Sequence, residues 1–246
     1  MNISVMKVLV FKDYDQMSRA AADLVIKQVK NKPHSLICFP SGESPAGVFK
    51  FLIADAHTGK VDFSDCYFVG LDEWVGMDKD DEGSCTNFLN ENFFTPLQIR
   101  AGKVMFFDAI ADDLDAACKA MDDFIIAHGP LDIMMVGIGM NGHIGLNEPG
   151  TDFNLYSHYA PLDPITKTVG QKYFKTQTPL TEGITLGLKH LQEAKTPILV
   201  ASAIKKARII AEALQGEITE QLPASIFQEL TSAYVLLDEA AASALI

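Results

Sequence analysis

Short runs of apolar residues alternate along this chain with longer segments in which apolar residues recur every three or four positions. A short apolar or β-branched run predicts a strand, and a longer segment with a period near 3.6 residues predicts an amphipathic helix. The predicted strands span residues 7–11, 35–39, 66–71, 104–108, 132–137, 196–201 and 233–238. The predicted helices span residues 14–30, 46–59, 87–94, 112–128 and 203–215.

This alternation of strands and helices is typical of an α/β fold. Parallel strands need crossover connections, and such crossovers place helices on both faces of the sheet. We therefore expect a doubly wound, mostly parallel sheet of Rossmann-like architecture. Neither an internal repeat nor a linker rich in Pro, Gly or Ser interrupts the chain, so residues 1–246 are expected to form a single domain. The least periodic stretch, 151–182, is predicted as loops with a short helix.

Composition narrows the choice of partners. The chain has 246 residues, 48% of them hydrophobic, which is enough to bury a substantial core. Its 32 acidic residues against 20 Lys and Arg give a formal net charge of -12. Nucleic acid and anionic membrane surfaces would repel such a chain, which argues against both as main partners. A small anionic ligand could still bind this acidic chain, but only at a site where local Lys or Arg side chains offset the overall negative charge.

The cysteines and the N-terminal region point to the cytoplasm. The four cysteines are scattered, without a CxxC pair or a Cys/His cluster, which favours free thiols in a reducing compartment. They are Cys38, Cys66, Cys85 and Cys118. The first residues carry no signal-peptide pattern, and no apolar run approaches the ~20 residues of a membrane span. We therefore expect a cytoplasmic protein.

Ligands of open α/β sheets bind beyond the carboxyl ends of the strands, and three loops at such ends are unusual: 40–45, 72–76 and 137–150. The first begins a helix near Pro45. Its backbone N–H groups and the two hydroxyls could hold an anion, although an ordinary capped loop fits the pattern equally well. The residues concerned are Ser41, Gly42, Glu43 and Ser44. In an anion site, Glu43 would offer its amide and turn its carboxylate away.

The second loop begins with two adjacent carboxylates, Asp72 and Glu73, directly after a buried strand. Adjacent residues of an extended chain face opposite sides, so we expect one of the two to enter a cleft. A carboxylate there could act as a general base. Without a partner, both would belong to a solvated acidic loop. Trp74, the only tryptophan, could wall the pocket or pack in the core.

The third loop carries a GxGxxG pattern directly after a strand. A dinucleotide-binding motif would begin a helix there, yet the sequence continues as HIGLNEPG, and the acidic residue expected ~20 positions later is missing. Instead, His143 and Glu148 can form an acid/base pair, with Asn141 nearby. The spacing of His143 and Glu148 matches no common metal-ligand pattern, so no metal is expected. Lys172 and Lys206 could serve a ligand or simply be surface charges.

Together, these loops resemble the glucosamine-6-phosphate deaminase/isomerase family over nearly the whole chain. The resemblance rests on SGESP (41–45), LDEWVG (71–76), GIGMNGHIGLNEPG (137–150), GITLGL (183–188) and KKARIIAEALQG (205–216). The related 6-phosphogluconolactonases share the fold, but a Phe-Pro-Gly-type ending replaces NEPG in them, which favours the deaminases. The spellings LDEWV, NGHIGLNEPG and GITLGLKHL are most similar to members that act on galactosamine 6-phosphate.

The resemblance implies a role for each candidate residue. The 41–44 loop and Lys206 would hold the phosphate of an amino sugar, helped by Lys172, which stands where the family usually has Arg. Asp72 would move a proton between carbons 1 and 2. His143 would open the sugar ring, oriented by Glu148. The resemblance implies neither a cofactor nor a metal.

A second residue departs from the family pattern, because Asn141 stands where Asp is usual. Asn can orient the histidine but adds no charge, so we expect ring opening to have a different pH optimum. Two other functions stay open at this stage: a lactone hydrolase of the same fold and a non-catalytic sugar-phosphate sensor. The oligomeric state is open as well, a homo-oligomer included.

Overall fold

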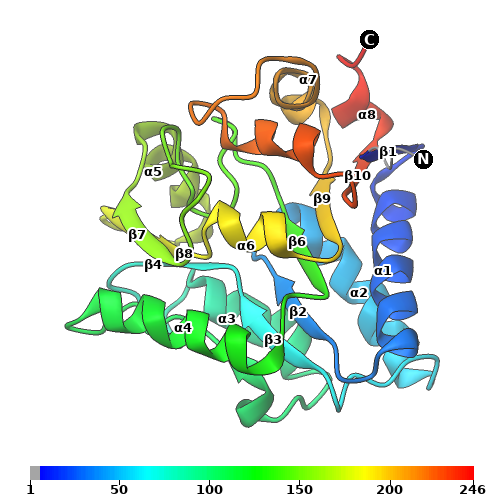
Figure 1. Ribbon diagram of the computed structural model, residues 1–246, viewed down its shortest axis with the longest axis vertical. Coiled ribbons are helices and arrows are strands. Elements are labelled where there is room, and N and C mark those ends of the chain that lie inside the picture. The colour runs from blue at the N-terminus through cyan, green and yellow to red at the C-terminus, as the bar shows by residue number, and fades with distance from the viewer. Residues whose placement is uncertain (1–5) are drawn as a thin grey trace.

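Within residues 6–246, which the computed structural model describes, seven parallel strands form the main sheet in the order β1-β10-β9-β6-β2-β3-β5 (Figure 1). The strands are β1 (Lys7–Phe11), β2 (Leu36–Phe39), β3 (Tyr67–Gly70), β5 (Val104–Met105), β6 (Ile133–Val136), β9 (Pro197–Ala201) and β10 (Tyr234–Asp238). Every residue of the central strands β2, β6 and β9 is buried, which explains their unbroken apolar sequences. The predicted parallel sheet is confirmed.

Helices cover both faces of this sheet, as the sequence predicts for a doubly wound fold. One face packs against α1 (Tyr14–Asn31), α2 (Glu43–His57) and α3 (Cys85–Leu89), which continues as a π-helix over Asn90–Phe94. The opposite face packs against α4 (Leu114–His128), α6 (Leu188–Glu193), α7 (Ala207–Gln215) and α8 (Glu239–Ala242). Short 3-10 helices span Ala101–Lys103, Gln171–Tyr173, Ile204–Lys206 and Pro223–Glu229. All four cysteines are buried and free, as predicted.

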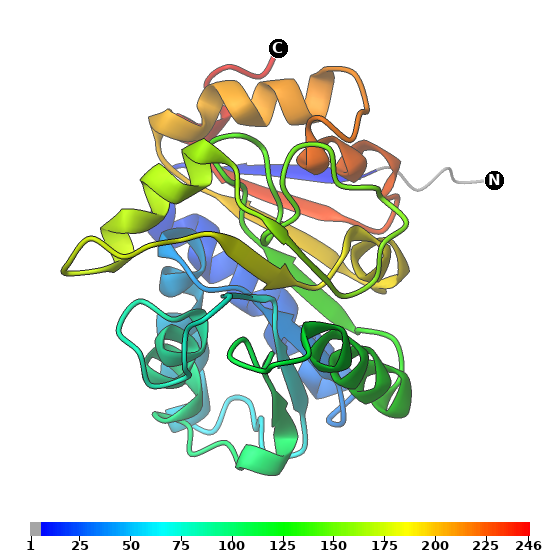
Figure 2. The same ribbon diagram turned by 90° about the vertical axis from the view of Figure 1, so that its left-hand side faces the viewer.

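A second, three-stranded antiparallel sheet lies above the carboxyl ends of the main strands, and Figure 2 shows it in front. Its order is β4-β8-β7, with β4 (Asp72–Trp74), β8 (Glu182–Thr185) and β7 (His158–Pro161). The sequence predicted loops where β4 and β7 lie, which is wrong, and it predicted no element for residues 183–185 of β8. Strands of three or four residues are too short to show a period. The short helix expected within 151–182 is α5 (Pro164–Gly170).

Two further boundaries differ from the prediction. Helix α2 begins at Glu43, two residues before Pro45, because Gly42 at its N-cap turns the chain directly out of β2. The strand expected over 104–108 pairs only at Val104 and Met105. Both differences follow from backbone geometry at loop junctions, which apolar periodicity does not report.

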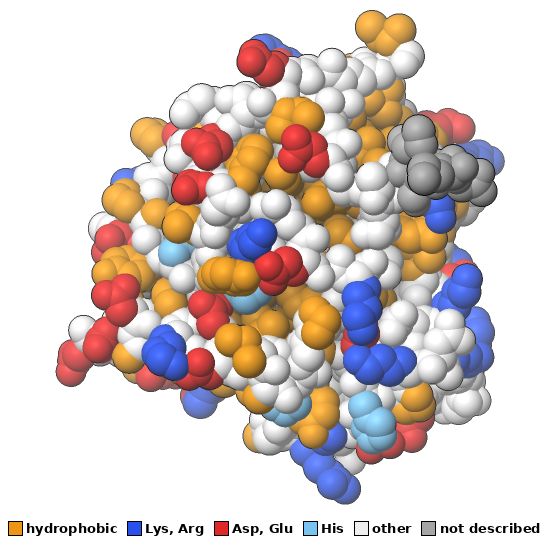
Figure 3. All heavy atoms as spheres, viewed as in Figure 1, with side chains coloured by type: hydrophobic (Ala, Val, Ile, Leu, Met, Phe, Trp, Pro, Cys, Tyr) orange, Lys and Arg blue, Asp and Glu red, His pale blue; other side chains and the backbone are white. Residues whose placement is uncertain are grey.

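On the face shown in Figure 3, acidic side chains and Lys or Arg side chains are interspersed in small groups. None of the helices between residues 6 and 246 is both long and apolar enough to cross a membrane.

Candidate active site

A cleft opens at the carboxyl ends of four neighbouring strands, β9, β6, β2 and β3. After β2, the next strands of the main sheet along the chain, β3 and β5, lie on one side of β2 and extend to one edge. The following strand, β6, lies on the opposite side of β2. This reversal of strand order splays the adjoining loops apart, and ligands of open α/β sheets bind at such a point. All three loops that the sequence analysis singled out contribute residues to the cleft.

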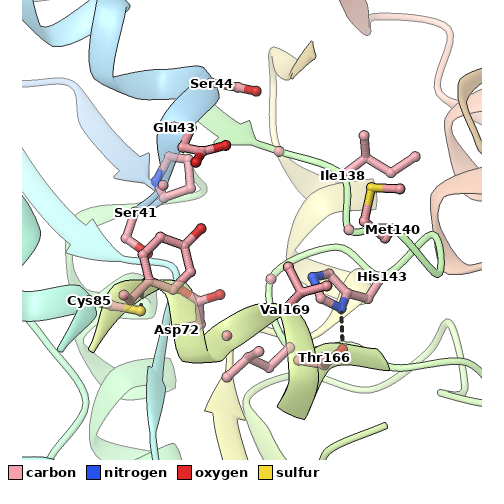
Figure 4. A pocket seen from close by; sticks show the side chains of 18 of the residues that line it. Ser41, Glu43, Ser44, Asp72, Cys85, Ile138, Met140, His143, Thr166 and Val169 are labelled. Carbon is pink, nitrogen blue, oxygen red and sulfur yellow. Dashed lines mark hydrogen bonds between the residues drawn. The ribbon is translucent and has the colours of Figure 1, made fainter. Parts of the chain in front are cut away.

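At one end of the cleft, the N-terminus of α2 presents free backbone donors. Gly42 is the N-cap residue, and no side chain of residues 6–246 caps the first turn. The φ angle of Gly42 is 113°, a conformation that residues with a Cβ rarely adopt. Glu43 and Ser44 follow it at the start of the helix, as Figure 4 shows, so their backbone N–H groups lie at this end of the cleft. A helix N-terminus of this kind favours an anion.

Lysine side chains surround the same end of the cleft. Lys206 donates a hydrogen bond from Nζ to the carbonyl oxygen of Ile138 at 2.5 Å. Burial, with help from the neighbouring Lys172 and Lys205, lowers the pKa of Lys206 to about 8. An ammonium group whose charge is so poorly compensated would gain from a bound anion.

Asp72 enters the cleft from the first position of β4. Its Oδ1 atom is buried and has no hydrogen-bond partner within residues 6–246. Burial and the charge of Glu73 raise the pKa of Asp72 to about 7, although a hydrogen bond with Cys85 lowers it. Asp72 is therefore suited to exchanging protons near neutral pH.

Glu73 points the other way, as the alternation of an extended chain requires. Its carboxylate accepts hydrogen bonds from the backbone N–H groups of Trp74, Cys85 and Thr86 and from the Ser84 hydroxyl, each at 2.9 Å. Glu73 thus anchors the start of α3 beneath the cleft. The expectation that one of the two adjacent carboxylates enters a cleft is confirmed.

His143 faces the cleft from the loop after β6 and is held from behind (Figure 4). Its Nδ1 atom lies 3.0 Å from Oγ1 of Thr166 and 3.3 Å from Oε2 of Glu148. Asn141 donates to the same Glu148 oxygen at 2.8 Å. Burial opposes the charge of Glu148, yet the hydrogen bonds from His143, Thr166 and Asn141 keep its pKa below the ordinary value.

The glycines of this loop make room for the histidine. A Cβ atom on Gly139 would lie 2.4 Å from the His143 ring, which no real contact allows. Gly142 has a φ angle of 83° and turns the chain immediately before His143. The glycine-rich sequence therefore serves to place an imidazole against backbone rather than to hold a dinucleotide.

The structure brings most of the predicted site residues together. The cleft is lined by Ser41, Gly42, Glu43, Ser44, Asp72, Asn141, His143, Lys172 and Lys206. Glu148 is buried behind His143 and does not line the cleft. Thr166 and Cys85 also line the cleft, although the sequence did not indicate a role for either. Thr166 lies on α5, whose start is marked by a recognisable signal, Asp163 as N-cap followed by Pro164.

These groups make one chemical unit: an anion-binding helix end, a carboxylate that titrates near neutrality, and an imidazole paired with a carboxylate. The fold and the site define an α/β enzyme that moves protons on a small phosphorylated substrate. The chain matches the family described as glucosamine-6-phosphate isomerases/6-phosphogluconolactonase over residues 12–235. The chain belongs to this family.

Individual relatives agree with this assignment. A glucosamine-6-phosphate deaminase of Thermoanaerobacter pseudethanolicus is 34% identical over 97% of this chain and 94% of its own length. One of Lysinibacillus sphaericus is 37% identical over 89% of this chain and 93% of its own. The solved structure of a monomeric glucosamine-6-phosphate deaminase is 32% identical, with a TM-score of 0.94 over 97% of this chain and 100% of that one. A 6-phosphogluconolactonase from Trypanosoma brucei, 16% identical with a TM-score of 0.78 over 98% of this chain and 99% of its own, shares the fold.

Proposed function

We propose that this protein is an amino-sugar-6-phosphate deaminase, which converts glucosamine 6-phosphate or its epimer galactosamine 6-phosphate to the ketose 6-phosphate and ammonia. The observation that carries the proposal is the shared cleft of Asp72 and His143, with free helix amides at one end. Relatives at 34% and 37% identity are glucosamine-6-phosphate deaminases, which supports the same reaction here.

Substrate binding begins with the phosphate. The amides at the start of α2 and the ammonium groups of Lys172 and Lys206 bind it at one end of the cleft. Because this contact is remote from the reacting carbons, its binding energy orients the sugar for the chemical steps. Lys172 contributes a point charge and not the two parallel hydrogen bonds of an arginine.

Ring opening needs an acid at the ring oxygen. His143 donates this proton through the ring nitrogen that faces the cleft, while Nδ1 stays with Thr166 and Glu148. As the C1–O5 bond breaks, His143 takes up the proton of the C1 hydroxyl, which leaves the open-chain aldehyde and returns the imidazole to its starting protonation state. Glu148 and Thr166 keep the imidazole oriented throughout.

Asp72 then acts as a base and as an acid in turn. Its carboxylate takes the proton from carbon 2 of the aldehyde and returns it to carbon 1, while one proton of the amine passes to O1. The aldehyde thus becomes a hydroxymethyl group, and a C2 imine replaces the C2 amine. Water adds to the imine, and ammonia leaves from carbon 2. The overall balance is amino sugar phosphate plus water giving ketose phosphate plus ammonia.

We propose galactosamine 6-phosphate as the preferred epimer. The motif spellings LDEWV, NGHIGLNEPG and GITLGLKHL support this choice through their resemblance to galactosamine-specific members. The apolar side chains of Ile138, Met140 and Val169 project into the cleft (Figure 4). A galacto sugar carries its 4-hydroxyl axially, which leaves an apolar ring face that such side chains can cover.

The test compares two substrates and one competing reaction. Ammonia release and ketose 6-phosphate formation are measured with glucosamine 6-phosphate and with galactosamine 6-phosphate. We expect both products in equal amounts and a higher kcat/KM for the galacto substrate. Hydrolysis of 6-phosphogluconolactone without ammonia release from either amino sugar would overturn the proposal, and a higher kcat/KM for the gluco substrate would overturn the epimer choice alone.

A further inference from the structure

A carboxylate of this chain occupies the lysines at the phosphate end of the cleft. Oε2 of Glu43 lies 3.2 Å from Nζ of Lys172 and 3.0 Å from Nζ of Lys205. The three residues come from different elements, since Glu43 is the first residue of α2 while the lysines follow α5 and β9. Figure 4 shows the Glu43 side chain extending into the cleft beside the start of α2.

Glu43 is charged in this arrangement. The hydrogen bond from Lys205 lowers the pKa of Glu43, and the contact with Lys172 adds to this effect, although partial burial opposes it. One residue therefore has two opposing relations to an incoming phosphate. Its backbone N–H belongs to the helix end that attracts an anion, whereas its carboxylate neutralises two of the nearby cations.

Lys206 differs from these two lysines in its partner, which is the carbonyl oxygen of Ile138. Its lowered pKa results from burial and from the repulsion of Lys172 and Lys205. Glu43 relieves only part of this repulsion. A phosphate with two negative charges can contact Lys206 and Lys172 together, which the single carboxylate on Lys172 and Lys205 does not do.

We propose that Glu43 is the resident counter-ion of the phosphate subsite and that Lys205 is its partner during binding. In this structure, Glu43 bridges Lys172 and Lys205. When a phosphate enters, it replaces the Glu43 carboxylate on Lys172, and Glu43 remains paired with Lys205. Phosphate binding is therefore an exchange of anions, and Glu43 weakens it. The inference rests on the proposed function, because it takes the phosphate subsite from there.

The exchange predicts a coupling between Glu43 and Lys205 that net charge alone does not. Removing the Glu43 charge frees Lys172 and should tighten phosphate binding about 1.5- to fivefold, the range expected for a solvent-exposed ion pair. Removing Lys205 leaves Glu43 on Lys172 and should weaken binding. In the Glu43→Gln background, however, removing Lys205 should weaken phosphate binding less. In that background there is no carboxylate that Lys205 must keep from pairing with Lys172.

The experiment titrates inorganic phosphate into the protein by calorimetry at fixed ionic strength. It compares the natural chain with Glu43→Gln, Lys205→Met and the double variant. The matched control is Glu82→Gln, which removes a carboxylate that pairs with Lys175 at 2.7 Å outside the cleft. Both glutamates are more than half exposed, so neither substitution disturbs the core.

Tighter phosphate binding by Glu43→Gln, with no change in Glu82→Gln, would support the exchange. Binding that is equal or weaker in Glu43→Gln would overturn it, and so would an equal gain in both glutamate variants. If the natural chain binds phosphate and Glu43→Gln binds no tighter, only this inference fails. If the natural chain binds no inorganic phosphate at all, the phosphate subsite of the proposed function fails with it.

Discussion

Asn141 donates a hydrogen bond to Oε2 of Glu148 at 2.8 Å, and the same oxygen lies 3.3 Å from Nδ1 of His143. The amide therefore shares the carboxylate with the imidazole and supplies no charge of its own. The side-chain oxygen of Asn141 also accepts the backbone N–H of His143 at 3.3 Å, which ties the two residues together. Asn141 thus positions His143 and Glu148 without adding a charge beside them.

Replacing this amide by a carboxylate should change the pH dependence of the reaction. In Asn141→Asp, the new carboxylate cannot donate to Glu148 and repels it, so the cluster holds a proton more firmly. We expect the basic limb of the kcat/KM profile for ammonia release to move up by about one pH unit. Asn154→Asp, a change on an exposed loop residue, is the control. Identical profiles for Asn141→Asp and the natural chain would contradict the expectation.

Asp72 is expected to carry the proton transfer. The Asp72→Asn variant keeps the shape and hydrogen-bonding capacity of the side chain but cannot take a proton, so kcat should fall about 10³-fold or more. Substrate binding should persist, because the phosphate is held at the other end of the cleft. Turnover and substrate Kd are measured in parallel, with Asp80→Asn from the exposed acidic loop as the control. Full activity of Asp72→Asn would refute the role.

The same substitution should stabilise the protein, and the gain should depend on pH. The pKa of Asp72 is about 7 in the folded state, against an ordinary value of 3.8. Below the ordinary value the carboxyl is protonated in both states and costs nothing, whereas above about pH 7 the folded state bears the full cost of a buried charge. Urea unfolding of Asp72→Asn should therefore show a gain of roughly 2–4 kcal/mol at pH 8 and almost none at pH 4. An equal gain at both pH values would speak against this origin.

The sequence predicted the main sheet well because each of its strands is a short, separate apolar run. β2, β6 and β9 are buried on both faces, so their residues are apolar without a break. The second sheet escaped prediction for the opposite reason. β7 alternates between half-buried and exposed residues over only four positions, and β4 has three residues. Their pairing with β8 depends on contacts between distant segments.

The candidate site was predictable where a functional residue belongs to a recognisable local sequence pattern. Asp72 and His143 each follow a buried strand within an unusual loop, and the alternation of an extended chain separates Asp72 from Glu73. Contacts across the fold were not predictable. Lys205 and Glu43 are 162 positions apart in the sequence, and neither has a local pattern that indicates the other.

Cys85 shows the same limit, because only the structure relates it to Asp72. The Ser41 hydroxyl donates to Sγ of Cys85 at 3.1 Å, and the thiol is in turn hydrogen-bonded to the Asp72 side chain. Burial raises the pKa of the Cys85 thiol well above its ordinary value, so the group stays neutral and can donate. A hydrogen bond to the charged form of a carboxylate favours that form. Cys85 therefore limits how far burial raises the pKa of Asp72.

Removing the thiol should make Asp72 a base only at higher pH. In Cys85→Ala, we expect the acidic limb of the kcat/KM profile to rise from about pH 7 by half a unit to one unit, which lowers the rate at pH 6.5 roughly three- to eightfold. Cys85→Ser restores a donor and should return the limb toward its original position. Cys118→Ala, which removes a buried thiol of α4 outside the cleft, controls for lost packing. If the acidic limb stays in place in Cys85→Ala while the overall rate drops, the thiol only packs against Asp72 and does not tune it.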